Sequence, residues 1–188
     1  MVDPVWKDIE STLLHFYSLP HNKIAIETHR KTPEATVKEK LEELRTGFIG
    51  IPKKEEFVGP KLFLRVVGPA NRVYSGEWWF DADQLNHLDQ IYSRIYFSST
   101  DRNMVIRNIL REILAISKKW PNTFEEVWAN EIPTGEKLTG FSGIVAPQKL
   151  FGNIPLNEKG NRMLVGRARQ IYFPVKNPLW VKQYRNLR

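Results

Sequence analysis

The feature that most restricts the fold of this chain is an amphipathic segment in its second half. Apolar residues recur there at the spacing of one helical face, and the basic residues fall off that face. The run Ser98–Asp101 before it has the residue types that begin helices. The pattern predicts a long helix up to about Lys119 that forms part of the core. Its apolar stripe consists of Val105, Ile106, Ile109, Leu110, Ile113 and Leu114.

Segments rich in β-forming residues lie on both sides of this predicted helix. Each is bounded by residues that favour turns, so these segments are predicted to be strands. The stretch Ser142–Gly166 is rich in glycine and proline and predicts a long loop of the kind that often covers a substrate site. The predicted strands are Lys61–Val67, Tyr74–Phe80, Glu125–Ile132, Lys137–Phe141 and Ala168–Val175.

The first 58 residues have a different character. Helices are predicted to begin at Asp3-Pro4 and at Thr32-Pro33, with a short strand at Lys23–Glu27 and a loop at Ile49–Glu56. No Ser/Gly-rich linker separates this part from residues 59–188, so one domain covering 1–188 is expected. The predicted fold class is α+β: a helical N-terminal part packed on a small mixed, mainly antiparallel β core with one long amphipathic helix.

Composition excludes several classes of protein. The 188 residues are 41% hydrophobic, enough for a core, and include no cysteine, which excludes disulfides, thiolate catalysis and Cys-based zinc sites. No apolar run approaches the roughly 20 residues of a membrane span, and the N-terminus lacks a signal-peptide pattern. We therefore expect a soluble, cytoplasmic protein with no membrane contact.

The net charge of +7 comes from the C-terminal end of the chain. From Lys159 to Arg188 there are basic residues and no acidic ones, which favours an anionic partner such as nucleic acid, nucleotide or acidic protein. The alternative is a solvated surface whose counter-charges come from the rest of the fold. If the partner is an acidic acceptor such as DNA or RNA, the residues expected to contact it are Arg167, Arg169 and Lys176.

Few motifs of established chemistry are present. The four histidines lack metal-ligand spacing, and there is no P-loop, nucleophile elbow or dinucleotide-binding glycine motif, so no metal is predicted. A nuclease-like pattern can be placed on Asp81, Glu131 and Lys137, but only loosely. The histidines are His15, His21, His29 and His87.

The remaining candidates are polar residues in or next to strands. Arg65 interrupts an apolar strand and is either an edge-strand ion pair or a clamp for an anion. Ser98 or Ser99 either caps the long helix or helps form an anion site at its start. Gly76 marks a bulge or a close approach to the backbone. Gln170 shares a strand face with Tyr172, and is either half-exposed or a ligand-orienting group.

Several of these short motifs resemble those of bacterial ADP-ribosyltransferase-fold toxin domains and the related NAD-glycohydrolase toxins. The resemblance covers about residues 61–175. Two departures are visible: the usual triple glycine is replaced by Gly166-Arg167-Ala168-Arg169, and Gln170 stands where many transferases have glutamate. The motifs are L-R-V-V-G-P, S-G-x-W/F-W, A-P-Q and G-x-A-R-Q-I-Y-F-P.

The resemblance implies an ADP-ribosyltransferase-like fold and a role for each candidate. Arg65 would hold the phosphates of NAD, and Ser98 or Ser99 would position this substrate. An aromatic side chain, Trp78 or Tyr172, would stack on the nicotinamide. Gln170 would contact the ribose as positive charge develops there, so Arg65 and Gln170 are expected to face one cleft.

Three functions follow as hypotheses. The first is an NAD-cleaving enzyme, an ADP-ribosyltransferase or NAD glycohydrolase that passes ADP-ribose to nucleic acid, protein or water. Such an enzyme would be a toxin or defence effector with an antitoxin or immunity protein as partner. The second is a nucleic-acid-binding protein or metal-dependent nuclease that uses the basic C-terminal third, with Tyr172, Trp180 and Tyr184 as stacking groups. The third is an interaction module without chemistry.

Overall fold

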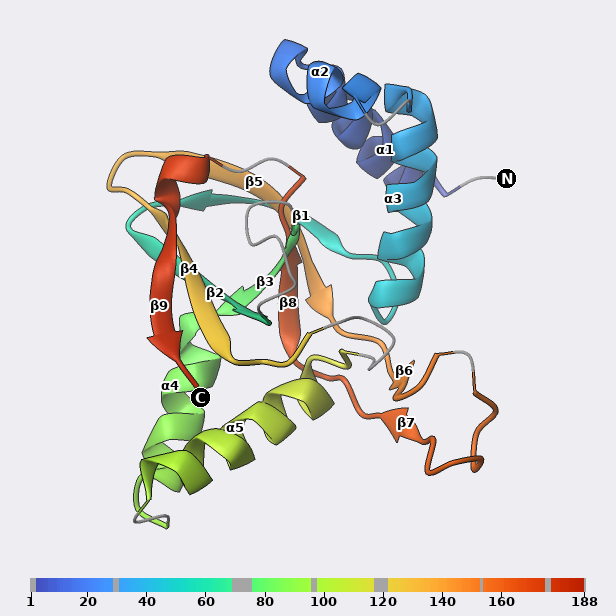
Figure 1. Cartoon of the computed structure of the whole chain (residues 1–188). Helices are drawn as coiled ribbons and strands as arrows, with labels where there is room; N and C mark the ends of the chain where they lie inside the picture. The colour runs from blue at the N-terminus through green and yellow to red at the C-terminus, as the bar shows by residue number, and fades with distance from the viewer. Residues whose placement is uncertain are drawn as a thin grey trace.

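The computed structural model describes residues 3–28, 31–68, 76–95, 98–116, 122–152, 154–174 and 177–187. A strongly curved antiparallel sheet forms the centre of the molecule, with one group of helices at each end of its outer face (Figure 1). Within these ranges, no helix combines the length and the apolar character needed to cross a membrane.

Seven strands form the main sheet, in the order β1-β5-β8-β3-β2-β4-β9, and every neighbouring pair in it is antiparallel. The predicted α+β fold class is confirmed. The helices are α1 Pro4–Tyr17, α2 Pro20–Thr28, α3 Pro33–Gly47, α4 Ala82–Tyr92 and α5 Ser99–Ile113, with a short 3-10 helix at Pro178–Trp180. The strands are β1 Lys53–Val58, β2 Lys61–Val67, β3 Trp78–Asp81, β4 Glu126–Ile132, β5 Lys137–Ile144, β8 Arg169–Tyr172 and β9 Val181–Asn186, with a separate pair β6 Gln148–Lys149 and β7 Met163–Leu164.

The inner, concave face of the sheet is filled by its own side chains. Phe57, Phe63 and Phe173 form a set of edge-on aromatic contacts, with ring centroids 5.0–5.5 Å apart. Every strand of the sheet, or the residue beside it, contributes to this core, which explains the strong curvature. The inner-face cluster consists of Phe57, Phe63, Trp79, Ile132, Leu138, Ile171, Phe173 and Val181.

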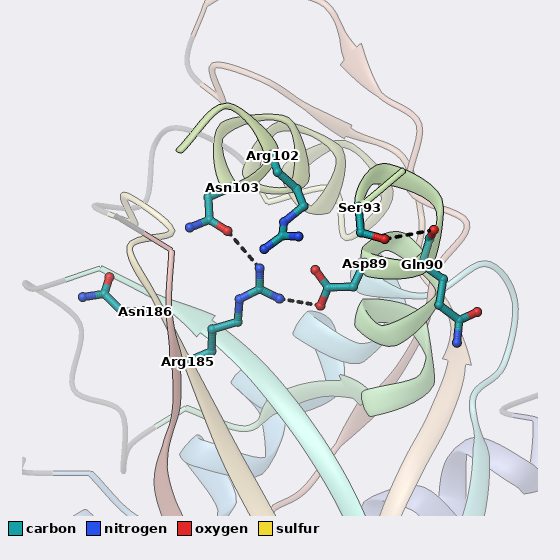
Figure 2. Close-up of a pocket in the computed structure, with 7 residues that line it drawn as sticks. All are labelled: Asp89, Gln90, Ser93, Arg102, Asn103, Arg185 and Asn186. Atoms are coloured by element: carbon teal, nitrogen blue, oxygen red, sulfur yellow. Dashed lines mark hydrogen bonds and ion pairs between the residues drawn. The ribbon is translucent and has the colours of Figure 1, made fainter. Parts of the chain in front are cut away.

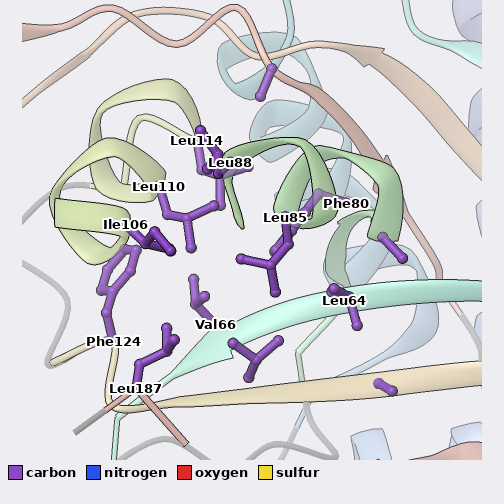
Figure 3. Packing of buried hydrophobic residues seen from close by; sticks show 14 residues of the cluster. Leu64, Val66, Phe80, Leu85, Leu88, Ile106, Leu110, Leu114, Phe124 and Leu187 are labelled. Carbon is purple, nitrogen blue, oxygen red and sulfur yellow. The ribbon is translucent and has the colours of Figure 1, made fainter. Parts of the chain in front are cut away.

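One half of the outer face is covered by α4 and α5, chiefly through apolar side chains (Figure 3). Ile106 and Leu110 of α5 are fully buried against Leu64 and Val66 of β2. This confirms the amphipathic helix predicted from the sequence, but the helix ends at Ile113 and not near Lys119, since Ala115 has a positive φ of 47°. Ser98 is its N-cap, because the Ser98 Oγ accepts a hydrogen bond from the Asp101 amide at 3.4 Å.

The other half of the outer face is covered by α1 and α3. Leu13, Leu41 and Leu44 are buried there against Phe141 and Tyr172 of the sheet. These helices begin where the sequence predicts. Asp3 and Thr32 accept hydrogen bonds from the amides of Val5 and Ala35, and each cap is followed by proline.

Two predictions for the first 58 residues were wrong. Lys23–Glu27 is not a strand but part of α2, because Pro20 begins a helical turn in which the Lys23 amide donates to the Leu19 carbonyl at 2.8 Å. Ile49–Glu56 is not all loop, because Lys53–Glu56 opens β1, which pairs with β5. The charged side chains of β1 are compatible with a strand because β1 lies at the edge of the sheet.

The glycine-rich stretch Ser142–Gly166 is more ordered than its composition predicts. Its start continues β5, and β6 pairs with β7. The buried Asn161 side chain closes the intervening turn, because its amide donates to the carbonyls of Phe151 and Ile154 and its oxygen accepts from the Phe151 amide. Glu112 of α5 anchors the end of the loop through two hydrogen bonds from Arg162.

Candidate functional site

Arg65 lies where two neighbouring strands separate. Its strand, β2, pairs with β4 along its whole length, and Arg65 stands opposite Trp128 on the inner face. On the other side, β2 pairs with β3 at only two positions, Phe63 with Asp81 and Leu64 with Phe80. The next residue is Arg65, so its long side chain enters the space that opens between β2 and β3.

Gly76 is the residue that receives the Arg65 guanidinium. A Cβ atom built at Gly76 would lie 0.8 Å from Nη1 of Arg65 and 1.6 Å from its Cζ, so no larger residue fits while Arg65 keeps this position. The sequence indicated that something approaches the backbone at Gly76. The structure identifies the approaching group as the arginine predicted to be functional.

The guanidinium of Arg65 is in an unfavourable environment. Burial lowers its pKa, and the carboxylates of Glu77 and Glu43 oppose that effect. Within the described part of the chain, its buried Nη1 has no hydrogen-bond partner. A buried cation with an unused donor destabilises the folded protein. An arginine with a purely structural role would be expected to have all its donors paired, so this one is a candidate for ligand binding.

Asn130 is a second unsatisfied group on the same inner face. It is fully buried in β4, directly opposite Phe63, and therefore diagonal to Arg65 at a typical distance of about 7–8 Å. Neither its amide nitrogen nor its oxygen has a partner among the described residues. Two neighbouring strands thus place unused hydrogen-bonding groups on one stretch of the inner face.

Lys40 links the two carboxylates near Arg65. Its Nζ lies 2.9 Å from Glu43 and 3.2 Å from Glu77, so it joins α3 to the residue that precedes β3. Burial alone would lower the pKa of Lys40, but the carboxylates of Glu77 and Glu43 outweigh burial and raise it. Lys40 therefore stays charged.

Aromatic side chains form the adjoining wall. The Trp78 indole N–H donates to Glu43, and its ring meets the edge of Tyr172 at 5.4 Å between centroids. The Tyr172 hydroxyl shares a 2.9 Å hydrogen bond with that of Tyr17, and burial raises the pKa of both phenols. Together these residues define the α3–β3 cluster: Tyr17, Lys40, Glu43, Arg65, Glu77, Trp78 and Tyr172.

Three residues predicted for the site are connected through the carboxylates of this cluster: Glu43 and Glu77 act electrostatically on Arg65 and Tyr172, and Glu43 accepts the Trp78 hydrogen bond. Gln170 does not join Arg65. It pairs with Phe80 and Gly143 on β8 and faces outward, whereas Arg65 faces inward, and it is 6% exposed. Strand alternation thus puts the two side chains on opposite faces of the sheet, and their common cleft stays a prediction.

The predicted serines lie elsewhere. Ser98 and Ser99 begin α5, at the end of the α4–α5 pair that points away from α1 and α3 (Figure 1). The Ser98 hydroxyl accepts a hydrogen bond from the Asp101 amide, so it acts as a helix cap. Its predicted contact with NAD stays a prediction.

The basic residues predicted to contact an acceptor are not equivalent. Arg167 is exposed. Arg169 is held by ion pairs to Asp81 at 2.8 Å and to Glu55 at 3.0 Å, and these pairs occupy its guanidinium. Lys176 lies outside the described residues.

The nuclease-like pattern is also dispersed. Asp81 pairs with Arg169, Glu131 with Lys182, and Lys137 with Glu56. Among the residues that the structure describes, no three His, Asp or Glu side chains gather as metal ligands.

Sequence reasoning missed Tyr17, Lys40, Glu43 and Glu77. Glu77 could have been found, because it directly follows Gly76 in a run where a close approach was expected. Lys40 and Glu43 give no such signal. They are ordinary charged residues of a helix until the tertiary structure brings that helix to β3.

Comparison with known proteins does not identify a family for this chain. No family model matches the chain, and no curated protein matches it. A solved structure of Tse6 in complex with Tsi6 contains a chain that is 12% identical, with coverage of 98% of this chain and 100% of that chain. Its TM-score of 0.41 is too low to support an argument about fold or function. The candidate site therefore depends on its own geometry.

Proposed function

We propose that this protein cleaves the bond between nicotinamide and ribose in NAD, with the α3–β3 cluster as its active site. The observation that carries the proposal is Arg65. Its buried guanidinium lies against Gly76 and has a donor without a partner among the described residues. Two carboxylates act on it electrostatically, and one of them, Glu43, accepts a hydrogen bond from the partly exposed Trp78 indole.

The proposed chemistry assigns one task to each group. Arg65 binds the pyrophosphate, for which a planar guanidinium is well suited. Trp78 stacks on the nicotinamide ring. When the C–N bond breaks, its electron pair leaves with nicotinamide and positive charge develops on the ribose. The Glu77 carboxylate stabilises that charge, and an acceptor oxygen then bonds to the ribose carbon and loses its proton.

Lys40 acts as a positioning residue in this proposal. Its contacts with both Glu43 and Glu77 hold the catalytic carboxylate beside β3. The acceptor is water, protein or nucleic acid, and the assay below separates these three. Because an unrestrained NAD-cleaving enzyme depletes the cofactor of its own cell, the proposal includes a toxin or effector role and an inhibitory protein partner.

The test is release of nicotinamide from NAD by the full chain, with and without protein and RNA acceptors. Glu77→Gln and Arg65→Ala should each reduce the rate by about 10²–10³, as expected for loss of a group that stabilises transition-state charge. Glu56→Gln is the matched control, because Glu56 is a half-exposed acid on β1 that pairs with Lys137. Wild-type release no greater than that of a Glu77→Gln, Arg65→Ala double variant would refute the proposal.

A further inference from the structure

A separate polar depression, largely open to solvent, lies between α4, α5 and the last strand, β9 (Figure 2). Its volume is about 490 Å³, and it contains none of the residues of the α3–β3 cluster. We call it the arginine pocket, lined by Asp89, Gln90, Ser93, Arg102, Asn103, Arg185 and Asn186.

Arg185 is fixed within this pocket. Its guanidinium forms an ion pair with Asp89 of α4 and donates a 2.9 Å hydrogen bond to the side-chain oxygen of Asn103 on α5. Asn103 is itself buried. Three elements distant in sequence therefore hold one guanidinium in a defined orientation.

Arg102 is different, because it has no such partner among the residues that the structure describes. Figure 2 shows its guanidinium directed toward the same space as that of Arg185, with no interaction drawn to it. Its Nε is buried without a hydrogen-bond partner, and the described part of the chain offers Arg102 no ion pair. Asp89 offsets only one of the two arginines, so the lining residues carry a net charge of about +1 at neutral pH.

We propose that the arginine pocket binds a phosphorylated sugar, with its phosphate on Arg102. A planar guanidinium with unused donors matches the geometry of a phosphate, and the fixed Arg185 adds positive potential beside it. A phosphate oxygen that accepts a hydrogen bond from the Arg102 Nε would remove the free-energy cost of burying that donor without a partner.

The rest of the lining favours the sugar over a nucleobase. Its uncharged side chains are a hydroxyl and three amides, from Ser93, Gln90, Asn103 and Asn186, all of which form hydrogen bonds with hydroxyl groups. None of the lining residues is aromatic, so a planar base would have no stacking surface. The depression is open to solvent, and its volume of about 490 Å³ leaves room for a sugar beside the phosphate.

This inference does not depend on the proposed NAD cleavage, since the two sites share no residue. The test is calorimetric titration of the full chain with ribose 5-phosphate, and with ribose and inorganic phosphate as partial ligands. Ribose 5-phosphate should bind with a dissociation constant of about 1 mM or tighter. Inorganic phosphate should bind about tenfold more weakly, and ribose should show no binding.

Variants then locate the site. Arg102→Gln should weaken binding about tenfold or more, and Arg102→Lys should give an intermediate loss because it keeps the charge but not the planar fork. Asp89→Asn should strengthen binding by about fivefold, because it removes the negative charge that competes with the phosphate. Arg107→Gln, on the same helix but outside the pocket, is the matched control.

Thermal unfolding of each variant without ligand separates loss of binding from loss of fold. The proposal is overturned if wild type does not bind ribose 5-phosphate at 10 mM, about tenfold above the expected constant. It is also overturned if a folded Arg102→Gln binds as tightly as wild type. Equal affinity for inorganic phosphate would overturn the assignment of the sugar.

Discussion

Two helical layers cover the outer face of the same sheet, but they meet it in different ways. The layer of α4 and α5 contacts β2, β3 and β4 through an uninterrupted apolar cluster around Leu110. The layer of α1 and α3 contacts β3 and β8 partly through polar groups, including the Tyr17–Tyr172 hydrogen bond and the Lys40–Glu77 ion pair. Stability alone favours the apolar solution, because buried charges cost desolvation energy. The apolar cluster around Leu110 therefore serves as scaffold, with the arginine pocket at its margin, whereas the α1/α3 layer places charged groups in the contact with the sheet itself.

The strongest test of this comparison is Leu110→Ala in the apolar layer. Leu110 is fully buried, so its truncation leaves a cavity and should lower the free energy of unfolding by about 2–5 kcal/mol. Urea denaturation measures this loss. Asn108→Ala, on the exposed side of the same helix, should change stability by no more than about 0.5 kcal/mol. If Leu110→Ala lowered the free energy of unfolding by less than about 0.5 kcal/mol, the role of α5 as scaffold would be contradicted.

The next effect concerns the polar layer and the contact between Gly76 and Arg65. Gly76→Ala places a methyl group on the guanidinium, so it should cost about 1–3 kcal/mol through overpacking. In an Arg65→Ala background the same change should cost less, because the obstructing group is absent. A double-mutant cycle by urea denaturation measures the coupling. Additive effects would show that Arg65 does not occupy this space in solution.

A smaller loss is expected from the tyrosine pair. Tyr172→Phe leaves the buried Tyr17 hydroxyl without its partner, which should cost about 1–3 kcal/mol, toward the lower end because Tyr17 is not entirely enclosed. Tyr17→Phe, Tyr172→Phe together should recover part of the loss, since no unpaired hydroxyl remains. If the double variant is less stable than either single variant, the pair is not an isolated hydrogen bond.

The smallest effect appears at alkaline pH. The pKa values of Tyr17, Tyr172 and Lys40 are raised in the folded protein above their usual 10.0 and 10.5. Each group therefore contributes stability that is complete below about pH 10 and is lost as the pH rises further. The free energy of unfolding should therefore fall as the pH rises above about 10, the usual phenol pKa, toward the raised pKa of the folded protein. The double phenylalanine variant should show a shallower decline, and an identical decline would refute the assignment.

Much of this fold follows from local patterns. The apolar stripe at Ile106 and Leu110 predicts α5, and proline after Asp3 and Thr32 predicts where α1 and α3 begin, because these signals act within a few residues. The edge strand β1 was missed because its charged residues carry no alternating apolar pattern.

The site was only partly predictable, for a physical reason. The alternation of β8 correctly puts Gln170 and Tyr172 on one face, but it does not say which face helices cover. Gln170 proves to be enclosed on the outer face while Arg65 faces inward. The contacts of Lys40 and Glu43 with the sheet arise only when α3 packs against β3, and no local pattern encodes that packing.

The charged edge of the sheet has a consequence for assembly. β1 and β9 are the outermost strands, and each has one strand neighbour within the described residues. Both carry charged side chains, Lys53 to Glu56 on one and Lys182 and Arg185 on the other, which disfavour the addition of a further strand from another molecule. A protein that binds this chain would therefore dock on side chains of its helices and loops, and continuous sheets between copies would be suppressed.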